Sequence, residues 1–284
     1  MRILITGAGG MLGKDVLEVL SQRGCETLPR YKNDLDITEL KQVYQCVENA
    51  KPDLIVNCAA YTNVDKAESE RELALKINGL GVRNLALACQ STQIPLMHIS
   101  TDYIFDGQKE EPYNIFDQPS PVNTYGWSKK VGEYYLTSLL SKFYLVRTSW
   151  LFGTGGGNFI ETIIKLGQRQ EELKVVDDQL GCPTFTKDLA RTMADLIETG
   201  YYGTYHVTNQ GKASWYQLAK EILNKCGSPA QIRAVKTFKY PRPAKRPSNS
   251  VLDPFPLYET LGYLLPHWQD ALERYLELRR EGVQ

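Results

Sequence analysis

Short apolar runs alternate with helical patterns through the first half of the chain, and this alternation restricts the possible fold more than any other feature. The apolar runs are short enough for buried strands, and the segments between them repeat with the period of an amphipathic helix. Such alternation is typical of βαβ units and a parallel sheet. The sequence therefore predicts an α/β protein with a Rossmann-type, doubly wound parallel sheet and a smaller, mixed α/β substrate-binding lobe.

The first half contains most of the predicted sheet. We expect strands at 2–6, 26–29, 53–58, 96–100 and 143–148, and helices at 10–23, 39–49, 69–90 and 125–140.

The pattern changes after Trp150, where a glycine-rich loop (FGTGGGN, 152–158) begins. Thr186 and Ser214 are expected to cap two of the helices that follow. The segment YPRPAKRPSNS is too rich in proline for regular structure. We expect an NAD(P)-binding domain at 1–150 and, at 151–284, mainly a substrate lobe with segments that return to the first domain. The predicted helices after Trp150 are 159–169, 187–198, 215–225 and 268–280, and the predicted strands are 205–208 and 232–237.

Composition excludes several classes of protein. The chain has 284 residues, with 33 Lys plus Arg and 33 Asp plus Glu, so its charge gives no sign of a nucleic-acid or membrane partner. No apolar run approaches the ~18 residues of a membrane-spanning helix, and the opening MRILITG is not a signal peptide. The six cysteines form no CxxC pair. We therefore expect buried thiols and a cytoplasmic location.

A glycine-rich turn lies directly after the first predicted strand. ITGAGGMLGKDV places Gly7, Gly10 and Gly13 before the first helix, with GxxGxxG spacing. Glycine permits a tight turn and a close approach of the backbone to a pyrophosphate, and a helix N-terminus supplies N–H groups to the anion. A purely structural turn remains the alternative, but the position after a strand favours a dinucleotide site.

The end of the second predicted strand bears on the choice of cofactor. NAD-binding proteins usually place an acidic residue there, but this chain reads LPRYK. Arg30 and Lys32 could pair with a 2′-phosphate, which favours NADPH over NADH. Two alternatives stay open: the basic residues are merely solvated, and Asp36 either contacts adenine or caps the next helix.

A tyrosine and a lysine lie four residues apart in SPVNTYGWSKK. With Asn123 or Thr124 as the cap, Tyr125 and Lys129 share one face of a helix. A neighbouring ammonium lowers the pKa of a phenol from its usual ~10. Tyr125 would then give a proton to a substrate carbonyl, Lys129 would hold the cofactor ribose, and Thr101, at a strand end, would orient the carbonyl oxygen. An accidental pair on an exposed helix is the alternative.

At this point the chain resembles the extended short-chain dehydrogenase/reductase family and, within it, the dTDP-4-dehydrorhamnose reductases. The resemblance runs end to end. It implies NAD(P)H-dependent reduction of the C4 keto group of dTDP-4-dehydro-6-deoxy-L-mannose (dTDP-4-dehydro-β-L-rhamnose) to dTDP-L-rhamnose. The motifs that carry it are ITGAGGMLG (5–13), LDIT (35–38), NCAAYTNVDKAE (57–68), INGLGVRNLA (77–86), HISTDYIFDG (98–107), YGWSK (125–129), VRTSWLFG (146–153), VVDDQLGCPT (175–184) and RPSNSVLD (246–253).

The resemblance also implies roles for individual residues. For the cofactor it implies that Gly10, Met11 and Leu12 line the pyrophosphate and that Asp36 and Ile37 contact adenine. The central region of the cofactor would contact Ala60, Tyr61 and Thr62. Further cofactor-binding residues would be Ala59, Asn78 and Ile99. For the substrate it implies Thr101 and Asp102 at the sugar, Trp150 packed against it, and Asn158, Arg242 and Arg246 at the diphosphate. Tyr125 and Lys129 would carry out the chemistry.

Other activities remain open beside this one. Dehydratases usually carry an acidic pair after the active-site threonine, whereas this chain has Thr101, Asp102 and Tyr103. Epimerases usually have a serine-rich strand end. A regulatory subunit of methionine adenosyltransferase resembles the same family without being a reductase, but this chain retains the catalytic residues. Some family members are dimers joined by a magnesium-bridged glutamate cluster. Those glutamates are not identifiable here, so monomer or homodimer and Mg²⁺ stay unassigned.

Overall fold

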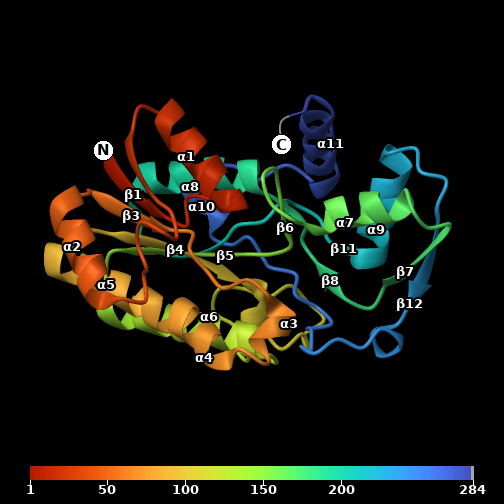
Figure 1. The fold of residues 1–284 in the computed structure, drawn as a ribbon, viewed down its shortest axis with the longest axis horizontal. Coiled ribbons are helices and arrows are strands. Elements are labelled where there is room, and N and C mark those ends of the chain that lie inside the picture. Colours follow the sequence, from red (N-terminus) through yellow and green to blue (C-terminus); the bar gives the residue numbers. More distant parts are fainter. Residues whose placement is uncertain (283–284) are drawn as a thin grey trace.

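The computed structural model describes residues 1–282, which form two lobes beside each other (Figure 1). A six-stranded sheet with strand order β10-β5-β4-β3-β1-β2 organises the first lobe, and all of its strands are parallel. The chain reverses its direction of winding between β1 and β3, as a doubly wound sheet does. The predicted fold class is therefore confirmed. The strands are β1 (Arg2–Thr6), β2 (Glu26–Arg30), β3 (Leu54–Asn57), β4 (Leu96–Thr101), β5 (Phe143–Thr148) and β10 (Gly203–His206).

Helices cover both faces of this sheet (Figure 1). One face packs on α1 (Met11–Gln22), α8 (Thr186–Thr199) and α10 (Leu257–Leu261), and the other on α2 (Leu40–Ala50), α5 (Val82–Thr92) and α6 (Thr124–Leu139). The alternation of strand side chains determines the layers, because Ile3 and Ile5 join the first core and Leu4 joins the second. Both cores are needed to bury a parallel sheet.

A π-helical turn interrupts the helix predicted at 69–90. The structure has α4 (Arg71–Leu75), the π-turn η1 (Lys76–Gly81) and then α5, preceded by the short helix α3 (Val64–Ala67). Such turns widen a helix locally and are frequent at functional sites. Here the π-turn contains the buried Asn78.

The second lobe has its own apolar core but no large sheet among the residues described. Three helices, α7 (Phe159–Gly167), α9 (Trp215–Lys225) and α11 (Trp268–Arg280), enclose a core with the aromatic residues Phe152, Phe185 and Tyr275. Its strands form two-stranded pairs, which are β7 (Glu172–Val176) with β12 (Gln231–Val235), β8 (Leu180–Gly181) with β11 (Ala213–Ser214), and β6 (Leu151–Phe152) with β9 (Thr184–Phe185). Within residues 1–282, no helix is both long enough and apolar enough to cross a membrane.

The chain passes back from the second lobe to the first. Helix α8 packs along α1, and β10 pairs in parallel with β5 as the edge strand of the main sheet. Helix α10 later returns to the same face. The first lobe is therefore built from segments on both sides of residue 150.

Local predictions had mixed outcomes. The cap by Ser214 is confirmed, with a reciprocal capping box to Gln217, and Asn123 caps α6. The cap by Thr186 is wrong, because Phe185 occupies the cap position and the Thr186 hydroxyl donates to the Phe152 carbonyl. The expectation of buried cysteines is confirmed for Cys89 and Cys182, but it is wrong for Cys226, which is exposed, and for three partly exposed residues, Cys25, Cys46 and Cys58. All six cysteines are free thiols.

Candidate active site

The backbone of the glycine turn after β1 packs too closely against neighbouring backbone to admit a side chain at Gly7 or Gly13. Gly7 has φ +67°, and a Cβ there would lie 2.5 Å from the Ala59 nitrogen. A Cβ on Gly13 would lie 2.3 Å from the Gly7 carbonyl oxygen. Gly10 begins α1 without a side-chain cap, followed by Met11 and Leu12. The turn is thus a cradle of backbone N–H groups at a helix N-terminus, which suits a pyrophosphate.

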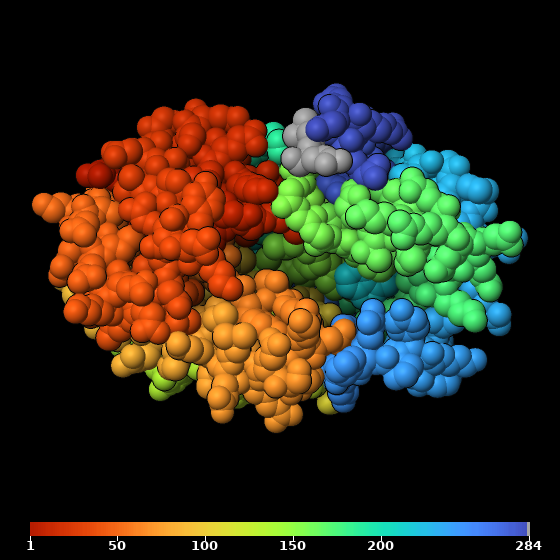
Figure 2. All heavy atoms as spheres, viewed as in Figure 1, coloured from red at the N-terminus to blue at the C-terminus, as the bar shows by residue number. Residues whose placement is uncertain are grey.

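The second lobe faces this cradle. Figure 2 shows a hollow between the red and orange surface of the first lobe and the green and blue surface of the second. Lys14 Nζ donates to the Gly155 carbonyl at 3.3 Å, so the loop after β6 lies against α1. Asn158 caps α7 by accepting from the Glu161 N–H, and its amide donates to Gly153 O at 3.0 Å and Tyr275 Oη at 3.2 Å.

The predicted catalytic residues lie where β4 ends and α6 begins. Thr101 is the last residue of β4, and its hydroxyl donates to Asp102 Oδ1 at 2.9 Å. Asn123 accepts from the Gly126 N–H at 2.8 Å, which fixes the first turn of α6 and the position of Tyr125. The Tyr125 ring meets Tyr103 edge to face at 5.9 Å. Tyr125 is partly exposed.

The pKa of Tyr125 moves opposite to the sequence expectation. Burial of the hydroxyl raises this pKa to about 12, with Thr101 acting in the opposite direction as a hydrogen-bond partner and the charge of Asp102 raising it further. The expected lowering of this pKa is therefore wrong for this structure: burial dominates, and Lys129 is not among the groups that shift the pKa. A phenol that keeps its proton at neutral pH is the form that a general acid requires.

Lys129 lies one helical turn further along α6 and is 2% exposed. Its Nζ donates to the Ile99 carbonyl at 2.5 Å and lies 3.4 Å from His98 Nε2. Burial lowers the pKa of Lys129 to about 8, although the charge of Glu133 acts in the opposite direction. A buried lysine that titrates near neutral pH is typical of functional sites.

Asp102 is a buried carboxyl beside Thr101. Only 2% of the residue is exposed, and its Oδ2 has no hydrogen-bond partner among the described residues. Burial raises the pKa of Asp102 to about 7. An unpartnered polar atom of this kind is expected where a ligand group completes the contacts.

The π-turn supports the segment that follows β3. Asn78 accepts from the Tyr61 N–H at 2.8 Å, and its amide donates to the Tyr61 carbonyl at 3.0 Å and to Ser128 Oγ at 2.9 Å. Ala59, Ala60 and Thr62 belong to the same segment. Asn78 therefore ties this segment to helix α6 between Tyr125 and Lys129.

The residues predicted at the 2′-phosphate and at adenine lie at the end of β2 and in the turn that follows it. Arg30 donates from Nη1 to the Pro29 carbonyl at 2.8 Å and from Nε to Cys46 Sγ at 3.3 Å. The exposed Asp36 accepts from the Thr38 N–H and hydroxyl, so its carboxylate already fixes a turn. Ile37 is buried in the core under this turn.

Trp150 has an unusual backbone conformation. Its φ is +48°, in the left-handed region that a bulky side chain rarely adopts. The indole stacks on Trp215, with the ring centroids 3.5 Å apart and the planes 4° from parallel. Strain of this kind persists where the surroundings enforce it, often at ligand sites.

An ion pair connects α3 with the segment after β12. Arg246 donates to both Asp65 oxygens at 3.0 Å, and Arg242 Nη1 lies 3.7 Å from Asp65 Oδ2. The Arg246 side chain is 18% exposed and that of Arg242 is 51% exposed. Both predicted diphosphate arginines are thus gathered on one carboxylate.

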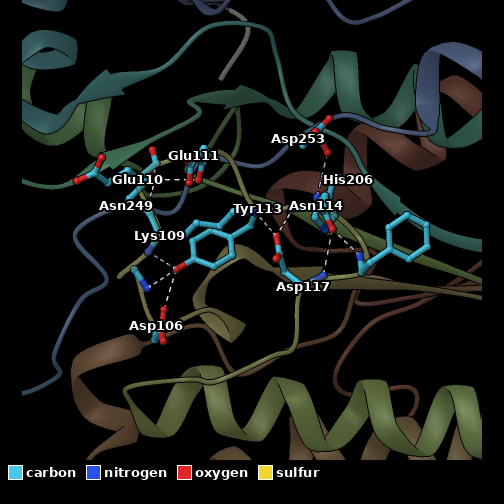
Figure 3. Close-up of polar contacts among 12 residues, drawn as sticks. Asp106, Lys109, Glu110, Glu111, Tyr113, Asn114, Asp117, His206, Asn249 and Asp253 are labelled. Atoms are coloured by element: carbon cyan, nitrogen blue, oxygen red, sulfur yellow. Dashed lines mark hydrogen bonds and ion pairs between the residues drawn. The ribbon is translucent and has the colours of Figure 1, made fainter.

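Side chains hold the loop after β4 to a segment far along the chain (Figure 3). Tyr113 Oη donates to Asp106 Oδ1 at 2.7 Å and accepts the N–H groups of Gly107 and Lys109. The Asn249 amide donates to three successive carbonyls of the loop, at Lys109, Glu110 and Glu111. These contacts hold the loop that follows β4 against the segment around Asn249.

Sequence reasoning missed several residues that the structure brings to the site. Asp65 and Trp215 hold predicted substrate residues, and Asn57 and His98 lie behind Lys129. Only Trp215 carried a local signal, as an aromatic residue next to the Ser214 cap. Among residues 1–282 no group of three or more His, Cys, Asp or Glu side chains could hold a metal ion.

A family model described as RmlD substrate binding domain matches residues 1–280. The chain belongs to the RmlD family. Its relatives include the dTDP-4-dehydrorhamnose reductase of Streptomyces griseus, 41% identical over 95% of this chain and 91% of the relative. The dTDP-4-keto-6-deoxy-D-glucose reductase of Streptomyces niveus is 39% identical over 98% of this chain and 97% of the relative.

A solved RmlD-family structure is also similar over nearly the full length. The dTDP-4-dehydrorhamnose reductase of Bacillus anthracis, crystallised in complex with NADP, is 43% identical. It aligns with a TM-score of 0.95 over 97% of this chain and 98% of that one. The recognition of this family from sequence motifs is therefore confirmed.

Proposed function

We propose that the protein is a dTDP-4-dehydrorhamnose reductase. It would use NADPH to reduce the C4 keto group of dTDP-4-dehydro-6-deoxy-L-mannose and so form dTDP-L-rhamnose. The observation that carries this proposal is the grouping of Thr101, Tyr125 and Lys129 at the end of β4, in a chain of the RmlD family. Relatives named for this reaction, and one solved with NADP, support it.

The first lobe would bind the cofactor. The turn after β1 would hold the pyrophosphate with backbone N–H groups at the N-terminus of α1, and Gly7 and Gly13 permit the tight turn because a Cβ on either would clash with neighbouring backbone. Met11 and Leu12 would offer their backbone N–H groups to it. Arg30 would meet the 2′-phosphate, Asp36 and Ile37 the adenine, and the segment from Ala59 to Thr62 the central part.

Bound NADPH supplies the hydride that reaches the carbonyl carbon. Tyr125 donates its phenolic proton to the carbonyl oxygen as that oxygen gains negative charge. Thr101 orients the same oxygen through its hydroxyl. Lys129, buried behind the tyrosine, holds the cofactor ribose and returns a proton to the phenolate. General acid catalysis of this kind is worth ~10²–10⁴-fold in rate.

The substrate would lie across the hollow between the lobes. Thr101 and Asp102 would contact the sugar, with the free Asp102 Oδ2 as a partner for a hydroxyl. The strained Trp150 would pack against the sugar ring. Arg242 and Arg246 would bind the diphosphate after exchanging Asp65 for phosphate oxygens. Asn158 would join them only by giving up a hydrogen bond to Gly153 or Tyr275.

A second candidate is reduction of another dTDP-4-keto sugar, because the Streptomyces niveus relative is named for dTDP-4-keto-6-deoxy-D-glucose. A non-catalytic regulatory role has less support, since the threonine, tyrosine and lysine are all present, with Thr101 and Lys129 buried.

The test is NADPH oxidation by the purified protein, followed as loss of its near-ultraviolet absorbance. The dTDP-4-keto-sugar isomers would be generated in place and supplied separately, with NADH run beside NADPH. Turnover to dTDP-L-rhamnose supports the proposal. Turnover with only the D-glucose-derived substrate supports the second candidate. Cofactor binding without turnover on either would overturn both and favour a regulatory role.

A further inference from the structure

A row of buried polar side chains crosses the main sheet and ends at Lys129. The strand register places Thr6 on β1 beside Asn57 on β3, and Asn57 beside His98 on β4. Thr6 is 1% exposed, and Asn57 and His98 are fully buried. His98 Nε2 then lies 3.4 Å from Lys129 Nζ. Polar groups this deep in a protein are held by their hydrogen bonds.

The hydrogen bonds of this row have fixed directions. The backbone N–H of Ala59 donates to Asn57 Oδ1 at 3.1 Å, and Thr6 Oγ1 donates to the same oxygen at 2.7 Å. A backbone N–H can only donate, so this contact identifies the amide oxygen. The other end of the amide, Nδ2, lies 3.0 Å from His98 Nδ1 and must donate to it. Nδ1 is therefore the acceptor, and the neutral imidazole carries its proton on Nε2.

The imidazole consequently directs an N–H group at the lysine nitrogen. A neutral amine has a lone pair that accepts this hydrogen bond, whereas an ammonium has only hydrogens to present. The Ile99 carbonyl, 2.5 Å from Nζ, accepts equally well from either form. We propose that His98 is a positioning residue for Lys129, holding the lysine nitrogen with an imidazole N–H that favours the uncharged amine.

Other groups around Lys129 do not reverse this preference. Glu133, one turn further along α6, binds Arg147 of β5 through two contacts of 3.1 and 2.8 Å, so its charge is compensated. Burial raises the pKa of the Cys58 thiol to about 12, which keeps that neighbour neutral. Tyr125, on the same helix, keeps its proton for the same reason.

Two further titratable groups near Lys129 belong to β4 and the residue after it, and these are His98 and Asp102. Burial raises the pKa of Asp102, which faces Tyr125. Burial, with the nearby Lys129, holds the pKa of His98 well below its usual value. The lysine, rather than the imidazole, is therefore the member of the pair that titrates near neutral pH.

This arrangement has a use in the reaction, and in that respect it rests on the proposed function. After Tyr125 gives its proton to the substrate oxygen, the phenolate must regain one. An N–H bond of the Lys129 ammonium breaks, and an O–H bond forms on Tyr125, directly or through an intervening hydroxyl. The resulting amine then accepts the His98 Nε2–H, and water later returns the proton to Lys129. His98 stabilises the amine produced in this step.

The first test is the imidazole tautomer, which is read without substrate. The chain has only three histidines, so ¹⁵N-histidine labelling with long-range ¹H–¹⁵N NMR spectra gives few signals. We expect His98 to be neutral and protonated on Nε2 from about pH 6 to about pH 9. A proton on Nδ1, or an imidazolium in this range, would overturn the proposal.

The second test reverses the tautomer with Asn57→Asp. The carboxylate keeps the contacts from Thr6 and Ala59 but accepts from His98 Nδ1–H, which leaves the Nε2 lone pair facing Lys129. The Lys129 pKa, followed by the ¹³Cε chemical shift, should rise by about one unit. Asn224→Asp, at an exposed position on α9, controls for the change in net charge alone and should leave this pKa unchanged.

Reversal of the tautomer with no change in the Lys129 pKa would show that His98 is only a packing residue. Where the wild type turns over, the basic limb of its pH–kcat profile should move with the lysine. Where it does not turn over, the proposed function fails, while the two NMR measurements still decide the role of His98.

Discussion

The two ends of the site are built in different ways. The proposed reaction centre lies where β4 ends and α6 begins, and it consists of Thr101, Tyr125 and Lys129. The hydrogen bonds of a strand and a helix fix its position. The arginine segment, with Arg242 and Arg246, lies on irregular chain and is held by an ion pair to Asp65. The first group contains the buried Lys129, which has no carboxylate partner within residues 1–282, whereas the two arginines are partly exposed and already paired with Asp65. If the proposed function is correct, the main sheet positions the catalytic residues, and an ion pair between side chains positions the arginines that recognise the substrate.

The strongest test of this contrast is Tyr125→Phe. The ring stays, so packing against Tyr103 and cofactor binding should change little. The proton donor is lost, and kcat should fall by ~10²–10⁴-fold. Steady-state kinetics and NADPH titration by fluorescence measure the two effects. A rate near that of the wild type would remove Tyr125 from the chemistry.

A second prediction concerns the stability cost of the buried lysine. The pKa of Lys129 is about 8 in the folded protein against 10.5 in the unfolded chain, so the unfolded state binds more protons between these values. Folding stability attributable to this group therefore rises from about pH 8 to about pH 10.5. Below that window the folded protein carries a penalty of about 3 kcal/mol, because each pKa unit is worth about 1.4 kcal/mol.

Lys129→Met should remove this penalty while losing one hydrogen bond to Ile99, worth about 1 kcal/mol. The variant should be more stable than the wild type by about 2 kcal/mol at pH 7, with the difference disappearing near pH 10. Urea unfolding at both pH values measures it. Equal or lower stability of the variant at pH 7 would mean that burial does not disfavour the charged form of Lys129.

These predictions concern the part of the molecule that the sequence describes best. Strands β1, β4 and β5 could be predicted because buried parallel strands are continuous apolar runs, and Tyr125 and Lys129 because helical spacing puts them on one face. The π-turn at Asn78 and the short strands of the second lobe could not be, because they depend on tertiary contacts. Nor could the pairing of Asp65 with Arg246, which lie 181 residues apart.

The arginine segment should respond differently from the reaction centre. Arg246→Ala removes two charge-assisted hydrogen bonds to a diphosphate, so KM for the dTDP-sugar should rise ~10–100-fold with kcat almost unchanged. Arg242→Ala should have a smaller effect, because that side chain is more exposed. Comparable losses of kcat in both variants would contradict the division between recognition and reaction.

The smallest expected effect concerns the cofactor. Arg30→Ala should weaken NADPH binding by about tenfold and NADH binding very little, because only NADPH carries the 2′-phosphate. Lys32→Ala, two residues further along, is the comparison for general loss of positive charge. Isothermal titration of both cofactors measures the ratio, and equal weakening of the two would place the 2′-phosphate elsewhere.

The return of α8 and β10 to the first lobe has a consequence for protein engineering. The two lobes are not interchangeable modules, since cutting the chain near residue 150 would leave β5 as an open sheet edge and bare the face of α1 that α8 covers. A chimera that exchanges substrate specificity within the RmlD family therefore has to graft the intervening segments of the second lobe and keep α8, β10 and α10 with their native sheet. Recombination between relatives faces the same constraint, which favours inheritance of the chain as one piece.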